Sequence, residues 1–208
     1  MARPVRCQHE IEHVREDILH AAGRAFSRRG FSRVTIHDIA REAGYTTPSL
    51  YAYFKGKQEI IDALYAIMTR EFESALDAPI PPTLGFPRRL GSLFERFLDI
   101  AERWPEARPL LLALRRSGLA KLDRAQKCAA KRSIDAKFVH WLKENMTSSR
   151  DLGGRKPAEM APIIRSLIFG AFLAEGSEDA RPSTPRNRFT LALQVCLYGI
   201  TGLGKDGS

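Results

Sequence analysis

Apolar residues recur every three or four positions along almost the whole chain, which is the period of an amphipathic helix. The first such stripe extends from Ile11 to Phe26, and Gly30 follows it at a position where glycine commonly ends a helix. Strands would require an alternation of apolar and polar residues, and the sequence shows no such alternation. The pattern therefore predicts an all-α fold.

A short helix is predicted directly after the first one. Thr35 and Asp38 have the spacing of an N-cap residue and an acid at the third helical position, where each side chain can bond the other's backbone N–H. Gly44 follows after barely two turns and is expected to end this helix.

A second short helix is predicted to follow at once. Thr47 is expected to be its N-cap, because Pro48 favours the first helical position and restricts the residue before it; Thr46 is the alternative cap. Leu50 and Phe54 are four positions apart, so both are expected to face the core.

The rest of the chain is divided by two segments rich in turn-forming residues. A fourth helix is predicted after Gly56, and residues 78–87 then hold four prolines in ten positions, which indicates a loop or linker. Residues 148–157 form the second linker. Two strongly apolar helices are predicted beyond it, at about 158–175 and 184–202.

Composition narrows the class of protein. Lys and Arg outnumber Asp and Glu by 33 to 24, giving a net charge of +9, which favours a polyanionic partner or surface. Cys7, Cys128 and Cys196 are odd in number and far apart, which indicates free thiols in a reducing cytosol, so a cytoplasmic location is predicted. The longest uncharged apolar stretch, residues 189–204, is shorter than the roughly 18 residues of a membrane span, so no membrane partner is expected.

Signatures of catalysis and of cofactor binding are absent from the sequence. It contains no P-loop, no nucleophile elbow, no zinc-protease motif and no dinucleotide glycine pattern, so neither an enzyme nor a cofactor is predicted. His9 and His13 have a spacing that can bind a metal on a helix, but no third ligand is evident nearby. Solvated surface histidines are the favoured interpretation, and no metal site is predicted.

The stretch from Thr46 to Lys57 has the chemistry of a surface that contacts DNA. Three hydroxyl side chains, two tyrosines and two lysines occur within twelve positions, without an acid. A helix-turn-helix places its second helix in the DNA major groove, where short hydroxyls can bond bases and phosphates. Lys57, at the start of the fourth helix, is expected to meet a phosphate, although it could be an ordinary surface lysine. Tyr51 could alternatively be a core aromatic residue.

Residues 11–65 resemble the DNA-binding domain of the tetracycline-repressor (TetR) family of bacterial regulators. The resemblance is carried by "ILHAAGRAFSRRGFSRVTIHDIAREAGYTTPSLYAYFKGKQEIIDALY", with the threonine that starts the second helix, the "IA..AG" pair and "SLYAYF..K" all at the family's spacing. Proline comes one residue later here than in many members. Carried over position by position, the resemblance implies that the DNA is lined by Thr35, Thr46, Thr47, Ser49, Tyr51, Tyr53 and Lys57.

The resemblance also implies an organisation in two parts. Residues 1–75 are expected to form the DNA-binding domain, with the helix-turn-helix at about 35–54, and residues 76–208 an all-helical domain for effector binding and dimerisation. The implied function is repression: a homodimer occupies a palindromic double-stranded operator and is released by a small-molecule effector of unknown identity. An activator, or a regulator without such an effector, is the alternative.

Candidate effector and interface residues follow from the apolar pattern of the second part. Six aromatic residues are candidates for the wall of an apolar effector pocket, or else simply fill the core: Phe94, Phe97, Trp104, Phe138, Trp141 and Phe172. The last two helices carry apolar surface wider than one core-facing stripe requires, so a dimer interface that includes Leu167 and Leu193 is predicted.

Three further features are open to two interpretations. His140, beside Trp141, could line the pocket or simply pack. The basic run at 115–132, on a predicted helix at about 119–145, could be a solvated helix face or could bind an anionic effector or DNA. Arg165 interrupts an apolar helix, where it could flank the dimer interface or pair with an acid or a ligand carboxylate.

Overall fold

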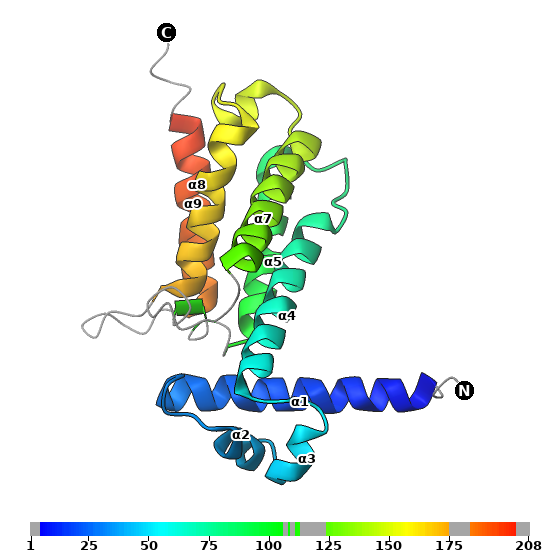
Figure 1. The fold of residues 1–208 in the computed structure, drawn as a ribbon. Helices are drawn as coiled ribbons and strands as arrows, with labels where there is room; N and C mark the ends of the chain where they lie inside the picture. Colours follow the sequence, from blue (N-terminus) through cyan, green and yellow to red (C-terminus); the bar gives the residue numbers. More distant parts are fainter. Residues whose placement is uncertain (1–4, 106–107, 109–110, 113–123, 175–183, 203–208) are drawn as a thin grey trace, which may run out of the picture. The chain divides into compact units, whose positions relative to one another are not determined.

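The computed structural model describes residues 5–105, 108, 111–112, 124–174 and 184–202 (Figure 1). All regular structure in these residues is helical, which confirms the predicted all-α fold. The elements are α1 (Val5–Arg29), α2 (Ile36–Glu42), α3 (Thr47–Tyr51), α4 (Lys57–Asp77), α5 (Phe86–Arg103), α7 (Arg124–Asn145), the 3-10 helix η1 (Ser149–Leu152), α8 (Pro157–Leu173) and α9 (Pro185–Gly202). Within the described residues, no helix has the length and apolar character of a membrane span.

The chain forms two compact units. The first contains residues 1–68 together with 104–123, and the second contains 69–103 together with 124–208. The division falls within α4. The domain boundary predicted from the sequence, between residues 75 and 76, also falls within this helix.

In the first unit, glycines end the first two helices as the sequence predicts. Gly30 and Gly44 both have φ of 76°, a conformation that glycine adopts without strain. The apolar stripe of α1 is buried, with Ile18 and Phe26 almost fully inaccessible. Burial of this stripe is the main favourable term that orders α2 and α3, because helices this short are marginal on their own.

Ion pairs tie the end of α1 to α2. Arg24 Nε lies 3.2 Å from Glu42 Oε1, and Arg28 pairs with the other oxygen of the same carboxylate. Arg29 Nη1 lies 2.8 Å from Asp38 Oδ1. The arginines are half exposed, so each pair contributes little by itself, on the order of 0–1 kcal/mol. Together they link the last turns of α1 to Asp38 and Glu42 of α2.

Aromatic rings pack against one another in the core of the second unit. The ring centroid of Phe97 lies 5.6 Å from that of Phe72 and 5.9 Å from that of Phe138, and Phe72 also meets Phe172 edge-on at 5.7 Å. Phe94 is 2% exposed. These phenylalanines therefore fill the core, which is the second of the two interpretations that the sequence allowed.

The last two helices closely match their predicted ranges. Thr184 caps α9, with its Oγ1 accepting a hydrogen bond from Asn187 N at 3.2 Å. The linker predicted at 148–157 is more ordered than expected, since it contains η1. The Asp151 carboxylate accepts hydrogen bonds from Thr147 N at 2.6 Å and Ser148 N at 2.9 Å, which shapes this turn and lowers the pKa of Asp151 against the opposing effect of burial.

Other sequence expectations have mixed outcomes. Arg165 Nε lies 2.7 Å from Asp135 Oδ1, so Arg165 pairs with an acid. His9 and His13 are both exposed on α1. Cys196 is a buried free thiol whose pKa is raised to about 11 by desolvation. The side chains of Cys7 and Cys128 and most of the basic run at 115–132 lie outside the described residues.

Candidate nucleic-acid interface

The first turn of α2 is closed by a reciprocal pair of hydrogen bonds. Thr35 Oγ1 accepts from Asp38 N at 3.2 Å, and the Asp38 carboxylate accepts from Thr35 N at 3.0 Å and from the Thr35 hydroxyl at 2.7 Å. The hydrogen bonds from Thr35, and then the nearby Arg29, lower the pKa of Asp38 from 3.8 to about 2. The predicted capping pair is therefore confirmed. The Thr35 hydroxyl, a predicted DNA contact, is already engaged in this cap.

The N-cap of α3 is Thr46, so the expectation that Thr47 caps this helix is wrong. Thr46 has extended backbone geometry, with φ of −76° and ψ of 152°, and its Oγ1 accepts from Ser49 N at 3.2 Å. Thr47 is the first helical residue and Pro48 the second. Thr47 Oγ1 instead bonds His37 Nδ1 at 3.0 Å, which joins α3 to α2.

One side of α3 is buried and the other is open to solvent. Leu50 and Phe54 are 0% and 1% exposed and supply the packing, as predicted. Thr46 and Ser49 are exposed, with their hydroxyl oxygens 2.7 Å apart. Tyr51 is 51% exposed, which contradicts the alternative that it is a core residue. We refer to Thr46, Ser49 and Tyr51 as the exposed face of α3.

The end of α3 is held by a residue that sequence reasoning missed. Arg15 of α1 donates a hydrogen bond to the Tyr53 carbonyl, and its guanidinium carbon lies 4.1 Å from the centroid of the Phe54 ring. Arg15 belongs to the polar side of a long helix, and no local pattern distinguishes it from its neighbours. Tyr53 is half-buried, with its ring centroid 6.5 Å from that of Tyr45.

The two lysines of this region have different surroundings. Lys57 is half-buried: its Nζ donates to the Phe31 carbonyl and lies 5.8 Å from the centroid of the Phe26 ring, and desolvation lowers its pKa. Lys55 is exposed; its backbone N–H donates to Glu59 Oε2 at 2.7 Å, and among the described residues its side chain has no hydrogen bond or ion pair. In the absence of DNA, the Lys55 side chain is therefore more accessible than that of Lys57 to an incoming phosphate group.

We expect the Lys55→Ala and Lys57→Ala variants to behave differently. Lys55→Ala should weaken operator and random DNA about equally and reduce the salt slope of binding by about one unit, because one phosphate contact is lost. Lys57→Ala should mainly lower the thermal midpoint, because the Phe31 carbonyl loses its donor. Salt titrations and thermal melts of both variants test this. A reduced salt slope for Lys57→Ala alone would contradict it.

The arrangement of α2 and α3, with a tight glycine turn and an exposed polar face on the second helix, defines a helix-turn-helix protein. Residues 18–64 match the family model described as bacterial regulatory proteins, tetR family. The match identifies this part of the chain as a TetR-type DNA-binding region.

Known proteins resemble the chain over different lengths. The HTH-type transcriptional regulator TtgR of Pseudomonas putida is 42% identical over 59 residues, so the match spans only 28% of each chain. The HTH-type transcriptional regulator YhgD of Bacillus subtilis is 29% identical over 91% of this chain and 96% of its own. The crystal structure of AibR in complex with isovaleryl coenzyme A and operator DNA has a TM-score of 0.64 and 18% identity, covering 88% of this chain and 98% of AibR. This last likeness concerns the fold.

Proposed function

We propose that the chain is a DNA-binding transcriptional regulator that occupies a palindromic operator as a homodimer and represses transcription. The exposed face of α3 carries this proposal, since it offers hydroxyl groups on a helix anchored from behind by Leu50 and Phe54. AibR, which has the same fold, binds operator DNA. A regulator of this kind acts on chromosomal DNA, which fits the predicted cytoplasmic location.

Dimerisation is supported by apolar side chains that remain exposed on the last two helices. Leu191, Val195 and Tyr198 of α9 are 61%, 53% and 75% exposed, and their spacing of four and three places them along one stripe. Ile163 of α8 is 53% exposed. A two-fold dimer would bury this surface by pairing it with its own copy.

The residues named from sequence as interface candidates lie closer to the core. Leu167 and Leu193 are both half-buried. A Cβ placed on Gly91 of α5 would lie 3.7 Å from Leu193 Cδ2, so Leu193 packs between α9 and α5. We therefore assign the interface to the α9 stripe of Leu191, Val195 and Tyr198, with Ile163.

A small-molecule effector remains part of the proposal. Of the six aromatic residues named as pocket candidates, Trp141 lines a pocket that the structure shows. Trp104 belongs to the first unit, where it stacks on His20 with 3.9 Å between ring centroids. AibR binds isovaleryl coenzyme A, which shows that this fold accommodates a small molecule as well as DNA.

The test is binding to DNA from upstream of the chain's own gene. We expect one dimer per site and an affinity roughly 10³-fold or more above that for random DNA, as is typical of specific regulators. A reporter driven by the same fragment should be repressed when the chain is present. Equal affinity for both DNAs would contradict specific recognition, and activation of the reporter would favour the alternative role.

A further inference from the structure

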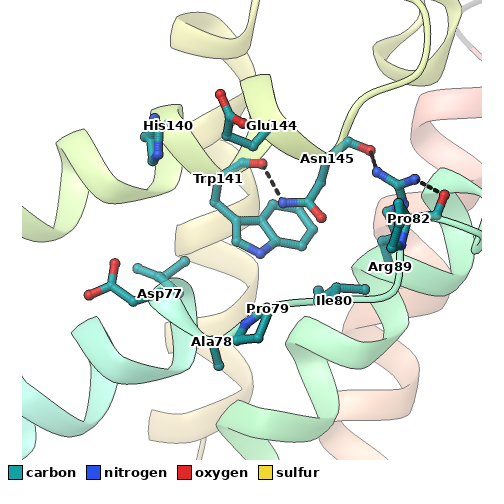
Figure 2. Close-up of a pocket in the computed structure, with 11 residues that line it drawn as sticks. Asp77, Ala78, Pro79, Ile80, Pro82, Arg89, His140, Trp141, Glu144 and Asn145 are labelled. Carbon is teal, nitrogen blue, oxygen red and sulfur yellow. Dashed lines mark hydrogen bonds between the residues drawn. The ribbon is translucent and has the colours of Figure 1, made fainter.

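A pocket of about 310 Å³ lies within the second unit, at the C-terminal ends of α4 and α7 (Figure 2). Its walls come from the last turn of α4, the segment 78–82 that follows it, Arg89 of α5 and the last two turns of α7. This volume is at the lower end of the range for small-molecule sites, about 300–1,000 Å³. The pocket therefore suits a small ligand.

The floor of the pocket holds a polar group without a partner. Trp141 is 3% exposed, and its buried indole Nε1 has no hydrogen-bond partner among the residues that the structure describes. Figure 2 shows this nitrogen on the edge of the ring that is turned toward Pro79. The carbonyls of Ala78 and Pro79 do not accept from this N–H. They accept from the Arg96 guanidinium, both at 2.7 Å. An unpaired buried N–H is costly, so this donor calls for an acceptor that a ligand can supply.

The Arg89 guanidinium, a cation that lines the pocket, already donates hydrogen bonds to backbone carbonyls. Arg89 is 7% exposed, and its guanidinium donates to the carbonyls of Leu84 at 2.6 Å, Asn145 at 3.1 Å and Pro82. These bonds join the 78–85 loop to the end of α7 and leave Arg89 as a structural part of the wall. Its position does not depend on a ligand.

The two acids that line the pocket, Glu144 and Asp77, are more exposed to solvent than Arg89. Glu144 is exposed, and within the described residues it has no ion pair or hydrogen bond. Asp77 is also exposed and accepts from Lys137 Nζ at 2.6 Å. Asn145 uses its Nδ2 to donate to the Trp141 carbonyl at 2.9 Å, so its Oδ1 remains an acceptor. The accessible polar groups therefore favour a positively charged donor at the rim.

We propose that this pocket binds a small organic ammonium ion that also carries a hydrogen-bond acceptor. The acceptor meets the Trp141 indole N–H on the floor, and the ammonium group lies at the rim against the Glu144 carboxylate, with Asp77 nearby. His140, which the sequence left between pocket and packing, stands at the same rim. This inference deepens the effector role proposed above and depends on it only for the effect of the ligand on DNA binding.

Three probes of similar size separate the two contacts. 4-Acetylbenzylamine has both the ammonium group and the acceptor, 4-ethylbenzylamine lacks the acceptor, and 4-ethylacetophenone lacks the charge. Each is titrated into the full-length ¹⁵N-labelled protein without DNA, while the indole N–H signals of its two tryptophans are followed by NMR. The Trp104→Phe variant assigns them, or Trp141→Phe if the first does not fold.

We expect 4-acetylbenzylamine to shift the Trp141 indole signal saturably. Each of the other two probes should bind about tenfold more weakly, as the loss of one buried polar contact predicts. Glu144→Gln should weaken both amines about threefold to tenfold and leave the ketone unchanged, because Glu144 interacts with the ammonium group. Glu102→Gln, the same change on an exposed acid of α5 outside the pocket, should have no effect.

Two outcomes would overturn the site. One is the absence of a saturable Trp141 shift with any probe, and the other is equal affinity for all three. Operator binding is measured separately, with and without 4-acetylbenzylamine. A saturable shift without an effect on operator binding still supports the site and contradicts only its effector role. Normal operator binding without any probe binding leaves the DNA-binding function intact and rejects the pocket.

Discussion

Val195→Asp is expected to convert the dimer into a monomer and to remove most of its affinity for a palindromic operator. Val195 lies at the middle of the exposed stripe of α9, so a carboxylate there would be buried without a partner in a two-fold interface. A monomer engages one half-site and loses the avidity of two linked heads, which is worth about 10²–10⁴-fold. Light scattering at micromolar concentration and operator titration measure the two effects.

Two further variants distinguish dissociation from unfolding. Ala136→Asp places the same charge on an exposed position of α7 and should remain dimeric. Leu193→Asp should instead destabilise the second unit, because Leu193 packs against Gly91. If Val195→Asp stays dimeric with unchanged operator affinity, the α9 stripe is not the interface.

Ser49→Ala is expected to weaken operator binding by about 1–3 kcal/mol with little change in the salt slope, if the hydroxyl bonds a base edge. The side chain is exposed on α3, and its removal leaves the helix cap intact, because Thr46 Oγ1 accepts from the backbone N–H of Ser49. The measurement is a titration of operator and random DNA at several salt concentrations.

Ser74→Ala is the matched control, since Ser74 is an exposed serine on α4 outside the exposed face of α3. It should bind both DNAs like the wild type. An equal loss of affinity of Ser49→Ala for operator and random DNA would show that Ser49 meets the phosphate backbone rather than a base.

Features that depend on a few neighbouring residues were predictable from the sequence. The capping pair of Thr35 and Asp38, the glycine that ends α1 and the cap at Thr184 each involve groups within four positions of one another, so local chemistry decides them. Local chemistry did not decide whether Thr46 or Thr47 is the N-cap of α3, because two adjacent threonines satisfy the same capping pattern.

Features that depend on distant contacts were not predictable. Lys57 bonds the carbonyl of Phe31, which is 26 positions away, and no local pattern indicates that its side chain is turned inward. Helical periodicity correctly indicated that Phe97 and Phe138 are buried, but burial alone does not distinguish a packed core from a pocket wall. Trp141, which the sequence offered as a candidate, does line a pocket, but the proline-rich segment that forms another wall carries no periodic signal.

The division of α3 into an anchoring side and an open side has a consequence for how the protein can evolve. Leu50 and Phe54 hold the helix in place, whereas Ser49 and Tyr51 contribute little to the core. Substitutions at these two exposed positions are therefore nearly neutral for folding, because surface changes are usually within about 0.5 kcal/mol. A duplicated copy of the gene could thus acquire a new target sequence through changes at positions 49 and 51 while keeping the same scaffold.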